Sequence, residues 1–251
     1  MKIALITDLH ANREAFEAVL ADARAWGYDQ LALLGDFVGY GGDPAWLLDT
    51  LQPLVSEGAI VVMGNHDQAV AQGALPSMRE DARLAVEWTR SQLNAEQLNF
   101  LARLPLTVKR HNCLFVHANA FAPAEFEYIQ GRAEAVRSMQ ATQSTYTFCG
   151  HMHDPMLYHL SGTGKAGEFT PVPGIEIPLM ANRQWLVVPG ACGQPRDGNP
   201  AACYARFDTQ TALLSFQRIP YDHEAAAARI LASGLPAAVA QRLADRLNQG
   251  T

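Results

Sequence analysis

The amino-acid sequence predicts an α/β fold whose first half contributes parallel strands, and two observations support this. Between residues 3 and 63, three short apolar runs alternate with two segments of helical periodicity, which is the order that a parallel sheet produces. After residue 156 the pattern changes to short β-like segments separated by turn-rich stretches. The second half is therefore expected to add meander-like strands, in a mixed or second sheet.

Length and composition limit the possible functions. The chain has 251 residues, 49% of them hydrophobic, so it can bury one large core. Its formal charge of −6 argues against a broad nucleic-acid or membrane surface, although bound cations could still attract an anionic substrate. We expect a single domain over residues 1–251 with a C-terminal helical extension at about 222–249, and the oligomeric state is left open.

Targeting signals and cysteines point to the cytoplasm. The apolar run after Met1 is too short for a signal peptide, and no stretch approaches the ~20 apolar residues of a membrane span. The four cysteines are widely spaced, with no Cys-x-x-Cys motif, which favours buried free thiols in a reducing compartment. We therefore expect a cytoplasmic protein.

Apolar runs and helical spacing give the elements of the first half. Asn12 is a plausible N-cap of the first helix, Gly27 a plausible stop, and Pro44 fits the first turn of the second helix. The spacing predicts strands at residues 3–6, 31–34 and 59–63, and helices from 12 to about 25 and from 44 to 54.

The rest of the chain continues this alternation before the change at residue 156. A helical pair is expected over residues 76–104, broken near 94–96, and we interpret it as a packing element rather than a substrate-binding one. An exposed loop or irregular hairpin is expected at 161–174, and two Ala-rich helices over 222–248. The remaining expected elements are strands at 113–116, 145–149, 156–160, 185–188, 203–208 and 212–219, and a helix over about 123–140.

Five of the apolar runs end within two or three residues of a side chain that can bind a metal. Ligands of open α/β sheets bind beyond the carboxyl ends of the strands, so these side chains are expected to converge in one cleft. Taken alone, the stretch Gly64–Asp67 is as consistent with a turn as with a site, but the recurrence favours a site. The candidates are Asp8 and His10, Asp36, Asn65 and His66, His117, and His151 and His153.

The ligand types indicate a particular chemistry. Carboxylate, imidazole and amide oxygen without thiolate suit divalent manganese, iron, zinc or nickel. Eight candidates are too many for one ion, but seven of them suit two ions that share a bridging carboxylate. Two such ions can clamp a phosphate and generate a hydroxide between them, and one further histidine is then free for proton transfer. The spacing does not tell which histidine that is.

These motifs resemble, in the same order, the motif set of the calcineurin-like metallophosphoesterases. Residues 190–197 and the terminal helices resemble a bacterial, phosphodiesterase-type branch of that superfamily. The resemblance implies an αββα four-layer sandwich, with two mixed β-sheets flanked by helices. The motifs are Asp8-x-His10, Gly35-Asp36, Gly64-Asn65-His66-Asp67, Val116-His117 and Gly150-His151-Met152-His153.

The resemblance also implies a role for each residue of the site. His66 would not bind metal, but would protonate the leaving oxygen or stabilise charge on the phosphoryl group, and Asp67 would orient His66 or support it electrostatically. Manganese is the most expected metal. One ion would be held by Asp8, His10, Asp36 and His153, and Asp36 would bridge to a second ion held also by Asn65, His117 and His151.

Four further residues are candidate substrate contacts, and two of them have a stated structural alternative. Tyr40 could line the pocket or pack, and Arg196 could bind a phosphate bidentately or fix a loop. The loop after Asp36 lacks the arginine of the superfamily's protein Ser/Thr phosphatases, so that activity is disfavoured. The four candidates are Asn12, Tyr40, Asn119 and Arg196.

The expected function is metal-dependent hydrolysis of a small phosphorylated substrate by a metal-bridged hydroxide. Phosphodiesters or dinucleoside polyphosphates are favoured over phosphoproteins, and phosphomonoesters remain an alternative. A non-catalytic scaffold is less favoured because the set of ligands is complete. A nuclease is less favoured because the chain is acidic and lacks a basic groove interleaved with aromatic residues.

Overall fold

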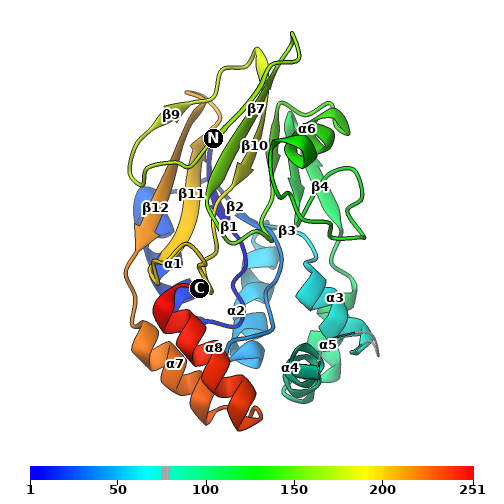
Figure 1. Cartoon of the computed structure of the whole chain (residues 1–251), viewed down its shortest axis with the longest axis vertical. Coiled ribbons are helices and arrows are strands. Elements are labelled where there is room, and N and C mark those ends of the chain that lie inside the picture. Colours follow the sequence, from blue (N-terminus) through cyan, green and yellow to red (C-terminus); the bar gives the residue numbers. More distant parts are fainter. Residues whose placement is uncertain (75–77, 79) are drawn as a thin grey trace.

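A computed structural model of the protein describes residues 1–74, 78 and 80–251, and it consists of two six-stranded sheets packed face to face between layers of helices (Figure 1). The predicted αββα class with two mixed sheets is confirmed. The first three strands are parallel, as expected. However, the five strands whose ends carry the site do not share one sheet, because three belong to the first sheet and two to the second.

The first sheet contains the N-terminal strand at its centre. β1 pairs in parallel with β2 and antiparallel with β11, so the sheet is mixed. Helices α1 (Arg13–Trp26) and α2 (Pro44–Ser56) belong to the helical layer that covers its outer face. The strand order is β3 (Ile60–Val61), β2 (Gln30–Leu33), β1 (Lys2–Ile6), β11 (Ala202–Asp208), β12 (Leu213–Ile219) and β9 (Ile177–Pro178).

The second sheet is also mixed. β6 pairs in parallel with both β5 and β10, whereas β7 runs antiparallel to β10. Helix α6 (Arg132–Gln140) packs against β7, β8 and β10. The strand order is β4 (Thr107–Arg110), β5 (Cys113–Val116), β6 (Tyr146–Phe148), β10 (Arg183–Val188), β7 (Met156–Ser161) and β8 (Ala166–Phe169).

Burial on both faces explains why central strands such as β5, and β1 after Lys2, are apolar rather than alternating. On β1, Ile3 and Leu5 face the second sheet, while Ala4 and Ile6 face the helices. Three phenylalanines lie in the layer between the sheets, with ring centroids about 5.5 Å apart, and they are Phe115, Phe148 and Phe207. This core holds the two sheets in register and so places their strand ends side by side.

Two cap predictions are confirmed. Asn12 caps α1 by accepting a hydrogen bond from the backbone N–H of Ala15, and Gly27 ends the helix in the left-handed conformation. All four cysteines are buried and free. Of the expected helical pair, α4 (Glu80–Ser91) and α5 (Ala95–Ala102) are present, and the expected start at residue 76 lies outside the described residues.

Three sequence predictions were wrong in detail. A helix, α3 (Asn65–Gln72), begins inside the stretch expected to be a loop, and Gly64 has an extended φ of −94° rather than a turn conformation. Of the helix expected over 123–140 only α6 forms, because residues 120–131 make an irregular loop. The short strands β4, β8 and β9 were not predicted, although β8 lies in the segment expected to be a loop or hairpin.

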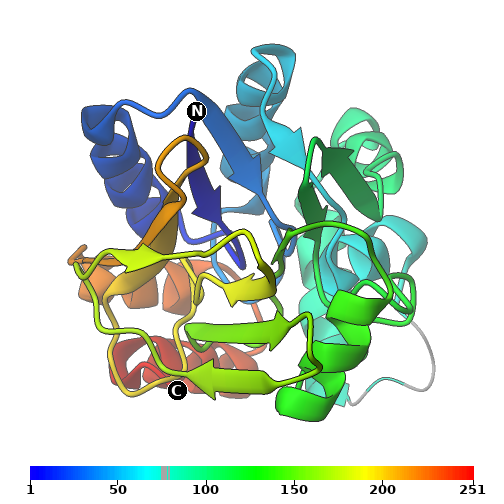
Figure 2. The same ribbon diagram turned by 90° about the horizontal axis from the view of Figure 1, so that it is seen from above.

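The C-terminal extension forms two antiparallel helices, α7 (His223–Ala232) and α8 (Ala237–Gln249), as expected. They pack on each other, and α7 packs on α1; Figures 1 and 2 show both helices beneath the strand ends. Arg229 anchors α7 to α1 through an ion pair with Glu14 of 2.7 Å. Among the described residues, no helix combines the length and hydropathy that a membrane crossing requires.

Candidate metal centre

Eight side chains from five loops meet where the carboxyl ends of both sheets face each other. The loops follow β1, β2 and β3 of the first sheet, and β5 and β6 of the second. The predicted convergence is therefore observed, across the seam between two sheets rather than along the edge of one. The side chains are Asp8, His10, Asp36, Asn65, His66, His117, His151 and His153.

Five of these residues have left-handed backbones, which is uncommon for residues other than glycine. Backbone hydrogen bonds hold them there, since the N–H groups of Asp8 and His10 donate to the carbonyls of Gly35 and Asp36. Strained backbone of this kind gathers at functional sites, where the surrounding structure enforces it. The φ angles are 53° for Asp8, 47° for His10, 53° for Asp36, 69° for His151 and 66° for His153.

The first cluster of candidate ligands consists of Asp8, His10 and His153, all buried. One donor atom from each lies within 4.8 Å of the others. His153 Nε2 is 3.4 Å from Asp8 Oδ1 and 3.2 Å from His10 Nε2. The other carboxylate oxygen of Asp8 accepts hydrogen bonds from the Thr7 hydroxyl and from the backbone N–H of His151. Asp8 Oδ1 therefore faces the two imidazoles.

The second cluster consists of Asp36, His117 and His151, with Asn65 beside them. His117 Nε2 lies 3.2 Å from His151 Nδ1 and 3.2 Å from the side-chain oxygen of Asn65. One carboxylate oxygen joins the two clusters, because Asp36 Oδ2 is 3.4 Å from His117 Nε2 and 3.8 Å from His10 Nε2. This is the position in which a carboxylate shared by two cations would lie.

The histidine tautomers fit metal binding. The Nδ1 atoms of His10, His117 and His153 lie 3.4, 2.7 and 2.5 Å from backbone carbonyls, to which they donate when protonated. Each Nε2 then directs a lone pair into the site, as metal-bound histidines do. Two such lone pairs face each other 3.2 Å apart at His10 and His153, and a cation between them would relieve the repulsion.

His151 supplies further evidence that the residues fit a cation. Its Nε2 is buried and has no hydrogen-bond partner among the described residues, whereas its Nδ1 faces the second cluster. Buried polar atoms without partners are rare and call for an explanation. A cation on Nδ1 would fix the proton on Nε2, which would account for the orientation of the ring.

Burial shifts the pKa values of several candidate ligands in the direction that favours their neutral forms. Burial lowers the pKa of His10 and His153 well below the usual value and that of His151 to about 3, and burial raises the pKa of Asp8 to about 6. His117 is the exception: burial lowers its pKa, but the charges of Asp36 and Asp8, together with hydrogen bonds to Asp36 and to the Leu34 carbonyl, raise it to about 9. In the metal-free protein, protonated His117 thus supplies part of the missing cation charge.

His66 lies at the start of α3, beside both clusters, and is only partly buried. Its backbone N–H donates to Asp36 Oδ1 at 2.9 Å, and its ring packs against Tyr40 with centroids 4.4 Å apart. A ring nitrogen is also within 4.8 Å of donor atoms of His10 and Asp36. Its role as a non-ligand stays a prediction from the family resemblance.

The structure corrects the role of Asp67. Its carboxylate accepts hydrogen bonds from the backbone N–H groups of Phe37, Val38 and Gly64, at 2.9, 3.2 and 2.9 Å. Among the described residues no hydrogen bond joins it to the His66 ring. Asp67 therefore ties the loop after β2 to the start of α3, and it positions His66 only through the backbone.

Two of the four candidate substrate contacts are engaged within the protein. The side-chain amide of Asn12 donates to the Gly193 carbonyl at 2.8 Å and to the Tyr221 hydroxyl at 3.1 Å, in addition to capping α1. Asn119 donates to one backbone carbonyl and accepts from one backbone N–H of its own loop, both at 2.8 Å. Both are buried and hydrogen-bonded within the protein, and their role as substrate contacts stays a prediction.

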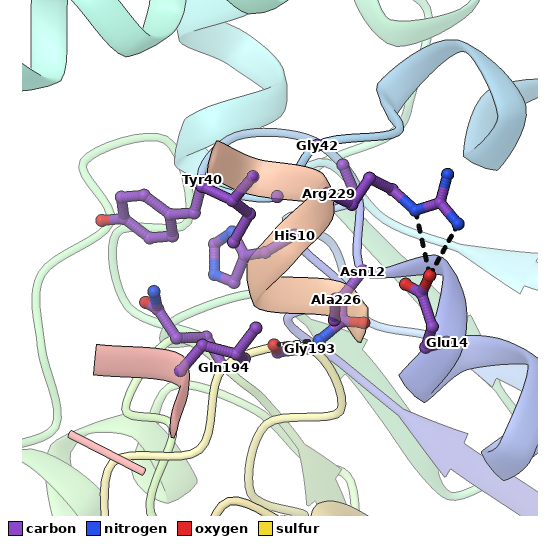
Figure 3. A pocket seen from close by; sticks show the side chains of 13 residues that line it. His10, Asn12, Glu14, Tyr40, Gly42, Gly193, Gln194, Ala226 and Arg229 are labelled. Carbon is purple, nitrogen blue, oxygen red and sulfur yellow. Dashed lines mark hydrogen bonds and ion pairs between the residues drawn. The ribbon is translucent and has the colours of Figure 1, made fainter. Parts of the chain in front are cut away.

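The other two candidates, Tyr40 and Arg196, lie at the site. The Tyr40 ring is 4.6 Å from the His10 ring, and its hydroxyl accepts a hydrogen bond from Arg196. The Arg196 charge also reaches the site, since it contributes to lowering the pKa of His10 and His66. Figure 3 shows the Tyr40 ring beside His10 at a cavity of about 10 Å³, which α7 closes.

Sequence reasoning missed Tyr128. Its ring stacks on His151 with centroids 4.0 Å apart and an interplanar angle of 17°, yet it is 48% exposed. It belongs to the loop 120–131, where helical periodicity was expected, and nothing in the spacing linked it to the site. The backbone carbonyls that orient His10, His117 and His153 could not be predicted from the sequence either, because any residue type can supply a carbonyl.

Two glycines are required by close approach. A Cβ at Gly64 would overlap the Asp36 carboxylate, and one at Gly150 would overlap Thr7 and Asp8. Both glycines precede predicted ligands, so in each motif the glycine lets one ligand loop pass directly against another.

Comparison with known proteins agrees with this geometry. The family model described as "Calcineurin-like phosphoesterase superfamily domain" matches residues 1–212. The chain belongs to this superfamily. The match ends before β12, so the C-terminal helices lie outside it.

Three proteins are similar to this chain over nearly their whole length. One is the uncharacterized protein MJ0912 of Methanocaldococcus jannaschii, 32% identical over 246 residues and 96% of each chain. A metallophosphoesterase from Sphaerobacter thermophilus has 34% identity and a TM-score of 0.86 over 100% of both chains. The hypothetical protein PH1004 from Pyrococcus horikoshii shares the fold at 19% identity, with a TM-score of 0.75 over 96% of this chain and 97% of its own.

Proposed function

We propose that this member of the calcineurin-like phosphoesterase superfamily is a two-metal phosphodiesterase that acts on small phosphorylated substrates. One observation carries the proposal: two clusters of metal-capable side chains face each other across Asp36 Oδ2, 3.4 Å from a histidine of one cluster and 3.8 Å from a histidine of the other. A single ion would need only one of these clusters. Two ions sharing a carboxylate would use both.

The donor set indicates which residues would hold each ion. Divalent ions bound there would supply the positive charge that polarises a phosphate ester toward attack by water. Oxygen and imidazole donors without thiolate favour manganese, with iron, zinc or nickel as alternatives. One ion would be held by Asp8, His10, Asp36 and His153, and the other by Asp36, Asn65, His117 and His151.

His66 is the group we assign to the departing oxygen. It is less buried than the six carboxylate and histidine ligands, and it stands beside Tyr40. From there its ring would give a proton to the leaving oxygen or hold charge on the phosphoryl group. Arg196, near the same edge, would add a further cation for the phosphate.

A diester or a dinucleoside polyphosphate is the substrate class that we favour. The loop after Asp36 contributes the Tyr40 ring to the site where the superfamily's protein phosphatases contribute an arginine. Without that loop arginine, Arg196 is the side-chain cation that we assign to the phosphate, and this suits a phosphate that bears one negative charge rather than two. Phosphomonoesters are the alternative, and a non-catalytic scaffold is a weaker one.

A hydrolysis screen in Mn²⁺ tests the proposal. It compares aryl monoesters, aryl diesters, cyclic nucleotides and dinucleoside polyphosphates, and we expect the highest kcat/KM on a diester or a dinucleoside polyphosphate. Preference for a monoester would transfer the assignment to the alternative. Purified protein that neither contains nor binds a divalent metal would support the scaffold.

The variant His66→Ala separates chemistry from metal binding. We expect a loss of about 10²–10⁴-fold in kcat on the diester with unchanged metal content. His111→Asn is a matched control, since His111 is exposed, left-handed and remote from the ligand clusters. An unchanged rate for His66→Ala, or lost metal, would remove His66 from the role proposed here.

A further inference from the structure

A groove separates helices α4 and α8 next to the metal centre. We call it the α4–α8 groove, and its volume is about 180 Å³. Figure 1 shows the two helices on opposite sides of the lower part of the molecule, below the strand ends that carry the site. The described residues that line it are Tyr40, Ala82, Ala85, Val239, Arg242, Leu243 and Arg246.

The lining has an apolar base and a cationic rim. Ala85, Val239 and Leu243 are buried, with 7%, 6% and 5% exposure. Arg242 and Arg246 are exposed and four residues apart on α8, so they extend from the same face of the helix. They are the only charged side chains among the described lining residues. Such a groove suits a ligand with an apolar body and an anionic end.

Tyr40 joins the groove to the site. It lines the groove, while its ring lies 4.4 Å from the His66 ring and 4.6 Å from the His10 ring. Its left-handed backbone, with a φ of 63°, holds the ring in this position. The groove therefore begins on the side of the site where His66 stands.

The chemistry of hydrolysis indicates which part of the substrate would lie on the His66 side of the site. The oxygen of water joins phosphorus, the bond from phosphorus to the leaving oxygen breaks, and the electron pair stays on that oxygen, which takes a proton from His66 or from solvent. Because His66 serves the leaving oxygen in the function proposed above, the remainder of the leaving group extends past Tyr40. The α4–α8 groove is the space found there.

We propose that the α4–α8 groove binds the leaving group of the substrate, and that this leaving group carries a second phosphate or similar anion, held by Arg242 and Arg246. The inference rests on the proposed phosphodiesterase function. It narrows the substrate class to phosphodiesters or phosphoanhydrides that release a phosphorylated product. An arginine pair and a phosphate form charge-assisted hydrogen bonds, which favours such substrates over neutral ones.

A matched pair of diesters tests the inference. Methyl 4-methylphenyl phosphate and methyl 4-(phosphonomethyl)phenyl phosphate differ only in a phosphonate on the leaving phenol. For the wild-type protein in Mn²⁺ we expect a KM about tenfold lower for the phosphonate. In the double variant Arg242→Gln/Arg246→Gln this ratio of KM values should fall to about one. Arg110→Gln, which removes an exposed arginine from β4, should keep the wild-type ratio.

A binding measurement distinguishes failure of the inference from failure of the proposed function. The probe is 4-(phosphonomethyl)phenol, titrated by calorimetry into wild-type protein and the double variant. Binding that weakens about tenfold in the double variant supports the groove even if neither diester is hydrolysed, and that second result would overturn the proposed function alone. Equal binding by both proteins, or a wild-type KM ratio of one, overturns the groove assignment. Circular dichroism of the double variant checks that α8 is intact.

Discussion

The two sheets contribute different chemistry to the same site. Loops of the first sheet supply both carboxylates, Asp8 and Asp36, together with the side-chain oxygen of Asn65, whereas loops of the second supply only imidazoles. His117 comes from β5, and His151 comes from the loop after β6, as does the neighbouring histidine of the first cluster. Each cluster combines candidate ligands from both sheets, so neither sheet alone could hold the two metal ions.

This difference shows where the charge of the site is balanced. The first sheet brings buried negative charge that is costly without a cation nearby. The second brings neutral donors that orient the cation without adding to that charge, apart from His117, which Asp36 keeps protonated when metal is absent. Metal binding should therefore connect the two sheets both electrostatically and mechanically. The predictions below test that connection, in order of decreasing effect.

The largest effect is expected from Asp36→Asn, which removes the carboxylate shared by the clusters. We expect loss of both metal ions and a fall in kcat of at least about 10³-fold, because both clusters lose their common charge. The second-sheet variant His151→Gln should lose only one ion. Metal content by mass spectrometry, measured alongside turnover, distinguishes the two. If Asp36→Asn retained two ions, the shared role of Asp36 would be rejected.

Metal removal should destabilise the protein, because the ions would be held by residues from both sheets and would connect them. Chelation by EDTA is expected to cost about 3–4 kcal/mol at metal concentrations far above the dissociation constant, seen as a fall in Tm of several degrees. The variant Asp36→Asn serves as the control, since EDTA should hardly change its Tm. A wild-type Tm that is insensitive to EDTA and to added Mn²⁺ would contradict the connection between the sheets.

Asp67→Ala tests the hydrogen bonds that join the loop after β2 to the start of α3, both of which belong to the first sheet's side of the site. It leaves three buried backbone N–H groups without an acceptor, so we expect the free energy of unfolding to fall by about 2–4 kcal/mol. Asp67→Asn keeps one acceptor oxygen and should cost less. Denaturant unfolding measures both. Equal stability of the two variants and the wild-type protein would show that Asp67 does not hold the loop after β2 against α3.

The smallest effect, counted per pH unit, concerns the stability of the metal-free protein. Burial lowers the folded-state pKa of four site histidines, so the unfolded chain binds more protons below about pH 6.5 and stability falls as pH falls. The pKa of Asp8 is raised to about 6 and that of Asp67 to about 7, and these two groups oppose the histidines in part.

The net expectation is a loss of about 1–3 kcal/mol per pH unit between about pH 6 and 4. His117, with a pKa of about 9, adds stability below pH 6.5 that is lost as pH rises through 9. Thermal unfolding with EDTA across pH 4–10 should therefore show a maximum near neutrality. A stability that rises steadily toward pH 4 would contradict the assigned signs.

The sequence by itself determined the candidate ligands, their order and the strands that precede them. Apolar runs followed by Asp, His or Asn are local patterns, and an N-cap such as Asn12 depends on neighbours three residues away. The motif order from Asp8 to His153 likewise needed only the chain itself to indicate the superfamily. For such short-range features the sequence is sufficient, since strand ends and caps form from contiguous residues.

Only the tertiary structure decided what depends on distant partners. Asp67 was expected to act on the neighbouring His66 ring, yet its carboxylate accepts hydrogen bonds from the backbone of a loop thirty residues away. The Asn119 side chain hydrogen-bonds within its own loop. The Tyr128 ring stacks on His151 from a segment that was expected to be helical. The division of ligands between two sheets and the groove between α4 and α8 likewise follow from packing. Hydrogen bonds and contacts between remote segments have no period in the sequence, because the fold alone brings their atoms together.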